Sequence, residues 1–156
     1  MEDWKQDRFG SILRGENPTL LCKMKSGFAV LADAQFLPGY CILLGYPEAG
    51  SLNELPPDGQ IQFLRDMALI GDAILAVCKP LRVNYSIMMN SLPILHAHIQ
   101  ARYDWEPEEN KCRPISSYPE EIFFSAEHEF DEQKHSELKR TLSDYLRRHS
   151  TANNSK

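Results

Sequence analysis

The first part of the chain alternates short apolar runs with turn residues, a pattern that predicts β-strands. Three such runs lie at residues 20–24, 28–33 and 40–45. The breaks between them are "KSG" at 25–27 and "FLPG" at 36–39, which hold the glycine and proline that tight turns favour. We therefore expect two successive hairpins.

The next stretch has the periodicity of an amphipathic helix that stops before Pro80. Its apolar residues form two neighbouring stripes, one of Ile61, Leu64, Ala68, Gly71, Leu75 and Cys78, and the other of Phe63, Met67, Ile70, Ile74 and Val77. These stripes predict a broad buried face over residues 61–78. Such a face is either wholly internal or packs partly on a second copy of the chain.

Two more strands are predicted at 84–89 and 95–101, joined by the tight connection "NSLPI". A polar, proline-bearing segment then leads to a last helix near 131–149 and a frayed tail over 150–156. Strands outnumber helices and connect through short turns. The expected fold is therefore α+β, an antiparallel sheet of about five strands in a single domain spanning 1–156.

Charge and composition argue against several classes of partner and location. The formal net charge is −5, and residues 104–132 hold ten carboxylates against two basic residues. Such a surface repels a phosphate backbone, so we expect no extended nucleic acid as a partner. No apolar run is long enough to span a bilayer, and the polar N-terminus is not a secretory signal. Four widely spaced cysteines fit reduced thiols in a cytoplasmic protein.

The candidate chemistry lies in "LHAHIQARY", residues 95–103. Alternate side chains of a strand share a face, so His96, His98 and Gln100 line one face while the residues between them face the core. A neutral imidazole can attack an electrophile, and a neighbouring imidazole or amide can hold the electrophile's oxygens.

Two other interpretations of this row of side chains remain. Alternating polar residues on an exposed strand need no function, and two histidines at i, i+2 can share a metal. For a metal, however, a third ligand is missing nearby, because Gln100 is a poor zinc ligand and the other histidines lie far along the chain. We therefore expect no metal and no cofactor.

The surroundings of these residues resemble the histidine-triad (HIT) superfamily. "NSLPILHAHIQARY" is similar to the family's H-x-H-x-H signature with its asparagine-bearing loop, and "FGSILRGENP" (9–18) is similar to the family's N-terminal segment. "FAVLADAQFLPGYCILL" (28–44) looks like the nucleotide-binding hairpin, and "SLNEL" followed by a long amphipathic helix matches in order. The resemblance covers about residues 9–103.

What the resemblance implies is a nucleoside-phosphate ligand, a homodimer and a histidine nucleophile. His98 corresponds to the histidine that attacks the α-phosphorus, and His96 to the triad member that orients the others. Asp33 resembles the acid that binds the ribose hydroxyls. The remaining family positions fall on Asn90 and Ser91 near the phosphate, and on the apolar Phe9, Ile12 and Leu31 of the nucleobase pocket. From the residues alone, Asp33 and Asn90 are equally turn residues, and the apolar three equally core.

The chain departs from the family pattern at two positions. Gln100 replaces the third histidine, and an amide holds an intermediate without acid–base work. Tyr40 stands where the family has a histidine after Pro-Gly, and a phenol with an unperturbed pKa near 10 is a weaker proton handler. The leading hypothesis is a hydrolase or nucleotidyltransferase with a histidine-bound intermediate. The alternative is a nucleotide-binding module with impaired catalysis, a sensor or interaction protein.

Overall fold

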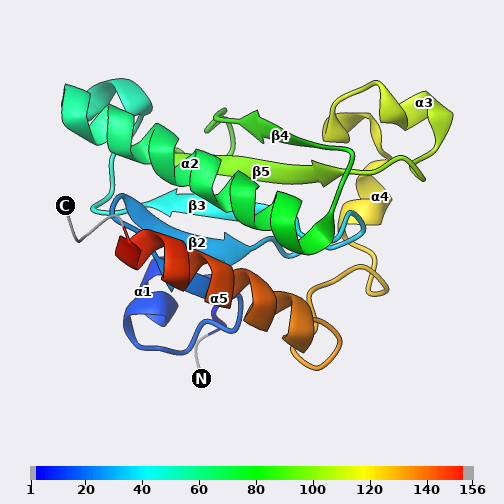
Figure 1. Cartoon of the computed structure of the whole chain (residues 1–156), viewed down its shortest axis with the longest axis horizontal. Coiled ribbons are helices and arrows are strands. Elements are labelled where there is room, and N and C mark those ends of the chain that lie inside the picture. The colour runs from blue at the N-terminus through cyan, green and yellow to red at the C-terminus, as the bar shows by residue number, and fades with distance from the viewer. Residues whose placement is uncertain (1–2, 153–156) are drawn as a thin grey trace.

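The computed structural model describes residues 3–152 (Figure 1). The strands are β1 (Leu20–Lys23), β2 (Gly27–Leu31), β3 (Cys41–Gly45), β4 (Arg82–Ser86) and β5 (His96–Arg102). The α-helices are α1 (Arg8–Leu13), α2 (Pro57–Cys78), α3 (Glu108–Lys111), α4 (Glu120–Phe123) and α5 (Ser136–Ala152), with 3₁₀ turns η1 (Leu52–Glu54) and η2 (Ile115–Ser117). The five predicted strands and two long helices are confirmed, with small shifts at their ends.

The strands form one antiparallel sheet in the order β1-β2-β3-β5-β4. The hairpins β1–β2 and β2–β3 are local, whereas β5 pairs with β3 across the whole of α2. Helices α2 and α5 lie side by side over one face of the sheet, and α1 lies beyond β1 and β2 (Figure 1). The α+β fold predicted from the strand pattern is thus confirmed.

The two faces of the sheet have different partners because side chains alternate along each strand. Leu43, Ala97 and Ile99 point toward α2 and α5 and are fully buried in the main core. On the opposite face, a small apolar cluster gathers under α1, made of Ile12, Phe28, Val30 and Leu44 with Phe9, Leu20 and Ile42. The row of polar side chains on β5 therefore shares its face with this smaller cluster.

Helix α2 is buried over a narrower face than its sequence suggested. The stripe containing Phe63, Met67, Ile70 and Ile74 packs in the main core, as expected. Much of the neighbouring stripe does not, since Ile61, Leu64 and Leu75 are 65%, 47% and 45% exposed. The reason is geometric: the sheet and α5 cover one side of a surface helix, and apolar residues beyond that side stay exposed.

The segment after β5 is ordered rather than open loop. Arg102 and Glu106 form a buried ion pair, with Nη2 2.8 Å from Oε1. The backbone N–H of Tyr103 and the hydroxyl of Tyr118 also donate to this carboxylate, at 2.7 Å each. Burial alone would raise the pKa of Glu106, but these hydrogen bonds together hold it below its usual value. The carboxylate thus anchors α3 and η2 against the end of β5.

The tail expected over 150–156 falls mostly outside the described residues. The backbone of residues 150–152 belongs to α5.

Candidate active site

The strand pairing sets where the candidate nucleophile lies. His98 is opposite Ile42 of β3 on one side and Ser86 of β4 on the other. His96 is opposite Leu44, and Gln100 opposite Asn84. The residues between them on β5 belong to the main core. His96, His98 and Gln100 therefore lie together on the face of the sheet away from α2 and α5.

Tyr40 is hydrogen-bonded to His98. Its hydroxyl lies 2.6 Å from Nδ1 of the imidazole, across 58 residues of sequence. The side chain of Gln100 also hydrogen-bonds this hydroxyl. Burial raises the pKa of Tyr40, so the phenol keeps its proton near neutral pH. When Nδ1 carries the ring proton it donates to this hydroxyl, and the lone pair of Nε2 is free to attack.

The second histidine, His96, is held in place by a hydrogen bond to the backbone. Nδ1 of His96 lies 2.7 Å from the carbonyl oxygen of Ile94, and a carbonyl can only accept, so Nδ1 carries the proton. The rings of His96 and His98 meet edge to face, with centroids 5.0 Å apart. This neighbour restricts how the His98 ring can turn.

The environment keeps His98 uncharged. Burial, with a smaller contribution from the positive charge that His96 can carry, lowers the pKa of His98 to about 4. The imidazole is consequently neutral at physiological pH. A neutral ring in a partly buried place is the form that a nitrogen nucleophile requires.

A cavity of about 250 Å³ opens beside the two histidines. It is lined by Val30, Ala32, Asp33, Ala34, Tyr40, Ile42, Leu44, His96 and His98, together with four residues from outside the sheet that we call its rim: Arg8, Leu92, Phe123 and Phe124. Most of the lining side chains are apolar and a few are polar, as in many small-ligand sites. Phe124 is 80% exposed at this rim.

Phe123 and Phe124 lie far along the chain from the strands that line the cavity, and backbone hydrogen bonds hold their segment near those strands. The N–H of Phe130 donates to the carbonyl of Asp33, and the N–H of Gln35 to the carbonyl of His128, both at 2.7 Å. These bonds fasten the segment after α4 to the strand end that carries Asp33. Phe123 packs edge to face on Phe36 of the same region, with centroids 5.0 Å apart.

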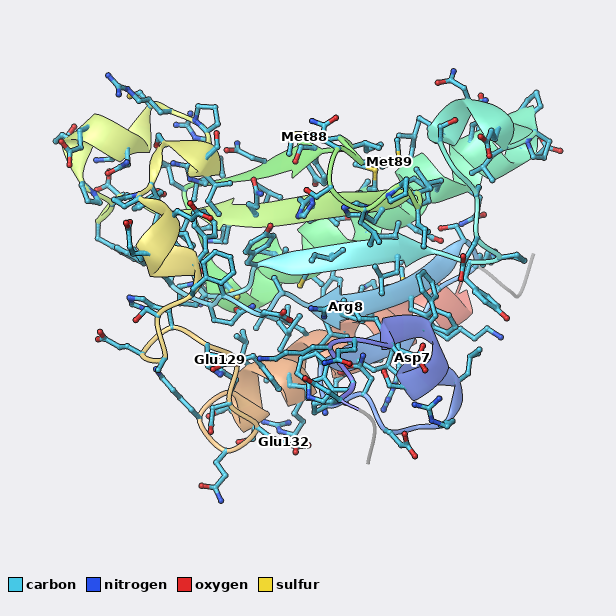
Figure 2. The ribbon with its side chains drawn as sticks, turned by 180° about the vertical axis from the view of Figure 1, so that it is seen from behind. Asp7, Arg8, Met88, Met89, Glu129 and Glu132 are labelled. Atoms are coloured by element: carbon cyan, nitrogen blue, oxygen red, sulfur yellow. The ribbon has the colours of Figure 1, made fainter. Side chains whose placement is uncertain are left out.

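Asp33 lines the cavity, but its carboxylate is already paired. Nη1 and Nη2 of Arg8 donate to its two oxygens at 3.1 and 2.5 Å. Arg8 comes from α1 and lies between that helix and the sheet (Figure 2). A ribose at this position would have to share or displace the guanidinium.

The three apolar residues assigned to the nucleobase pocket separate in the structure. Phe9 and Ile12 belong to the small cluster next to the cavity. Leu31 is fully buried in the main core on the other face of the sheet, and so it does not line the cavity. Strand alternation puts its neighbour Val30 there instead.

The two residues expected near the phosphate lie in the loop between β4 and β5. Asn90 and Ser91 are both exposed, and neither lines the cavity. The loop includes Met88 and Met89 (Figure 2), and Met89 has a left-handed backbone with φ of 55°. Leu92 of this loop does reach the cavity rim.

Sequence reasoning missed several cavity residues. Tyr40 was singled out as a departure but given no role, and Arg8, Phe123 and Phe124 gave no local signal. Only the Pro-Gly step before Tyr40 pointed to a residue close to the histidines.

Residues 3–152 contain neither a cluster that could bind a metal ion nor a helix that could span a membrane. Within that range no three histidine, cysteine or acidic side chains gather closely enough to hold a metal ion. No helix there has the length and apolar character needed to cross a membrane.

Comparison with solved structures shows that this fold is similar to that of histidine triad proteins. A histidine triad protein from Sinorhizobium meliloti superimposes with a TM-score of 0.70, at 16% identity, over 93% of this chain and 96% of that one. A histidine triad nucleotide-binding protein from Sulfolobus tokodaii gives 0.66 at 14% identity, covering 90% and 92%. Diadenosine triphosphate hydrolase from Plasmodium falciparum gives 0.56 at 13% identity, covering 85% and 78%. No family model and no curated protein matches the sequence.

Proposed function

We propose that this chain, which has the histidine-triad fold, binds a nucleoside phosphate and transfers its nucleotidyl group to His98. The observation that carries the proposal is the state of that ring: neutral, partly buried, and held through Nδ1 by the hydroxyl of Tyr40 at 2.6 Å. Two proteins with the same fold are named for nucleotide binding and for diadenosine triphosphate hydrolysis, which supports a nucleotide as the ligand.

The proposed reaction has two steps. Nε2 of His98 attacks the α-phosphorus, the bond from phosphorus to the leaving oxygen breaks, and the leaving group departs with that electron pair. A water or another hydroxyl then attacks the same phosphorus, the P–N bond breaks, and its electrons return to Nε2. The attacking oxygen gives up its proton to solvent, because Gln100 cannot accept it.

The surrounding residues have distinct proposed parts. The Tyr40 hydroxyl accepts the Nδ1 proton of His98 and orients the ring, and the neighbouring His96 holds that orientation. The amide of Gln100 donates to the oxygens of the adduct. The nucleoside occupies the cavity of about 250 Å³, with its base against Val30 and the small cluster containing Phe9 and Ile12. Asp33 faces the ribose once Arg8 turns away, and Asn90 and Ser91 reach the phosphate only if their loop closes.

The direct test is intact mass after incubation with a set of nucleoside triphosphates and dinucleoside polyphosphates. Wild type should gain the mass of a nucleoside monophosphate, and His98→Ala should not. His149→Ala is the matched control, since His149 is exposed on α5 and remote from the site. Adduct formation by His98→Ala at the wild-type level would show that His98 is not the nucleophile.

The second candidate is a binding module with impaired catalysis. It is favoured by the pairing of Arg8 with Asp33 and by glutamine at the third triad position. It predicts that nucleotides raise the melting temperature while no adduct or product forms. The same incubation decides between the two, since an adduct excludes the module.

We also infer a homodimer. The exposed Ile61, Leu64 and Leu75 lie on α2, the helix that packs over β5 and the edge strand β4. A second copy would cover these side chains. Sedimentation velocity should give a dimer at micromolar concentration, and Leu75→Glu should shift it toward monomer. A wild-type monomer at that concentration would reject the inference.

A further inference from the structure

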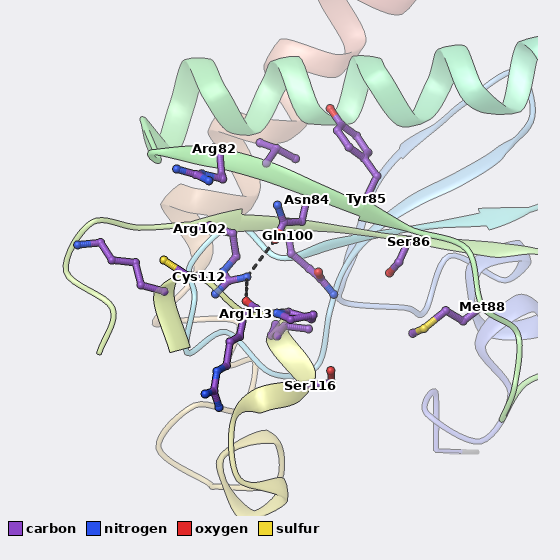
Figure 3. A pocket seen from close by; sticks show the side chains of 14 residues that line it. Arg82, Asn84, Tyr85, Ser86, Met88, Gln100, Arg102, Cys112, Arg113 and Ser116 are labelled. Carbon is purple, nitrogen blue, oxygen red and sulfur yellow. Dashed lines mark hydrogen bonds between the residues drawn. The ribbon is translucent and has the colours of Figure 1, made fainter. Parts of the chain in front are cut away.

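A second, larger cavity lies on the same face of the sheet, beyond Gln100. Its volume is about 770 Å³. It is lined by β4, β5 and the segment from α3 to η2: Arg82, Val83, Asn84, Tyr85, Ser86, Met88, Gln100, Arg102, Lys111, Cys112, Arg113, Pro114, Ile115 and Ser116 (Figure 3). We call it the β4–β5 groove. It shares no lining residue with the cavity beside the histidines.

The charge of the β4–β5 groove is opposite to that of the chain. All of its charged lining residues are basic, although the protein carries a net charge of −5. The contrast is sharpest in residues 104–132, where ten carboxylates accompany two basic residues. Both basic residues, Lys111 and Arg113, line the groove, and none of the ten carboxylates does. The fold thus gathers positive charge here out of an acidic segment.

Two of these charges are not neutralised. Arg102 is paired with Glu106, and Lys111 lies 2.9 Å from Asp104. In residues 3–152, neither Arg82 nor Arg113 has a carboxylate within ion-pair distance of its guanidinium.

Neutral donors join these guanidiniums in the groove. Oδ1 of Asn84 accepts from Nη1 of Arg102 at 3.0 Å, which leaves the Nδ2 hydrogens of Asn84 available to a ligand (Figure 3). Ser86, Ser116 and Gln100 add a hydroxyl, a hydroxyl and an amide. Guanidinium, amide and hydroxyl donors together, without a carboxylate, suit a phosphate.

The groove begins next to the candidate nucleophile. Ser86 is directly opposite His98 in the ladder, and Asn84 is opposite Gln100. Directly opposed residues put their side chains on the same face of the sheet, about 5 Å apart. From Ser86 to Arg82 the strand runs on for about 13 Å. The groove is therefore within reach of a group that leaves the α-phosphorus at His98.

We propose that the β4–β5 groove binds the phosphates of the leaving group, that is, of the half of the substrate that is not transferred to His98. This rests on the proposed function and specifies its substrate: a nucleotide joined through its α-phosphate to a second, phosphate-bearing group. The cavity beside the histidines holds the transferred nucleotide, and Arg82 and Arg113 hold the charge of the departing half.

Binding of inorganic tripolyphosphate tests the groove without any reaction. Titration calorimetry should show binding to wild type and to His98→Ala. Arg82→Gln and Arg113→Gln should each weaken it about tenfold, the effect of losing one hydrogen bond to a charged group. Arg140→Gln is the matched control, an exposed arginine on α5 away from the groove, and should bind as wild type does. Melting temperatures would verify that the variants fold.

The link to the reaction is tested with two substrates that differ in the leaving group. Diadenosine triphosphate releases a nucleoside diphosphate, whereas adenosine 5′-(4-nitrophenyl phosphate) releases a phenol without phosphate. The double variant Arg82→Gln/Arg113→Gln should lose about 10²-fold in kcat/KM with the first and little with the second. Equal losses with both substrates, or tripolyphosphate binding that Arg140→Gln weakens as much as Arg82→Gln does, would overturn the proposal. Tripolyphosphate binding without any adduct at His98 would reject the proposed function and keep the groove as a polyphosphate site.

Discussion

Lowering the pH is a sharp test of the environment assigned to His98. With its pKa lowered to about 4, this imidazole should stay neutral well below the point where an exposed histidine takes up a proton. At pH 5.5 about 97% of a ring with that pKa is neutral, compared with about 9% of a ring with the ordinary value of 6.5. The nucleophilic form should therefore be roughly ten times more abundant than in an unperturbed ring.

The measurement has a direct and a functional arm. The proton chemical shifts of the imidazole rings, followed by NMR from pH 8 to pH 4, should move only at the acid end for His98. The His98→Ala spectrum identifies the signal. The single-turnover rate of adduct formation should stay level from pH 8 to about 5 and fall only as the pH approaches 4.

The sign of the effect on stability follows from the same shift. Between pH 6.5 and 4 the unfolded chain binds a proton at His98 that the folded chain does not bind. The contribution of this ring to the free energy of unfolding therefore decreases as the pH falls through that window. His96→Asn removes the neighbouring ring that lowers the pKa and should move the His98 titration upward. A midpoint near 6.5 for His98 in wild type would refute this account of its environment.

Other substitutions test further parts of the site and its support. Gln100→His should supply a proton-transferring ring and raise hydrolysis of the adduct by up to about 10²-fold; an adduct lifetime unchanged by mass spectrometry would make Gln100 a spectator. Tyr40→Phe should slow adduct formation about tenfold, because His98 loses the hydroxyl that orients it, and a wild-type single-turnover rate would contradict this. Glu106→Gln should cost about 3 kcal/mol in urea unfolding, because Arg102 is left buried without its counter-charge; an unchanged midpoint would argue against a structural role for the pair.

The sequence predicts the sheet well because its information is local. Alternation along 95–101 is enough to put Ala97 and Ile99 in the core and the polar row opposite them, and the structure agrees. The same rule shows why Leu31 was assigned to the wrong face: the family resemblance suggested an apolar residue, but parity along β2 selects Val30. Which alternate residues of a strand face the core depends on where the strand begins, and the family resemblance does not give that position.

Other features depend on contacts between distant segments, which periodicity does not encode. The apolar stripe with Ile61 and Leu64 has the same spacing as a buried one, and only the extent of the covering sheet shows that it is exposed. The contact between Tyr40 and His98, and the positive β4–β5 groove, likewise need the pairing of β5 with its neighbours. The acidic composition of residues 104–132 gave no sign of the groove, because a count of charges along the chain does not show which way each side chain points.

The strand order has a consequence for how the protein reaches its active form. The contact between Tyr40 and His98 joins the start of β3 to β5, and the β3–β5 pairing brings together segments about fifty residues apart in the chain. Loops of that length close at an entropic cost, so long-range pairings form later in folding than local hairpins do. The β1–β2–β3 meander can form early, but it contains no histidine. On refolding, the ability to form an adduct should therefore return with the slowest main phase and not with early gains in secondary structure.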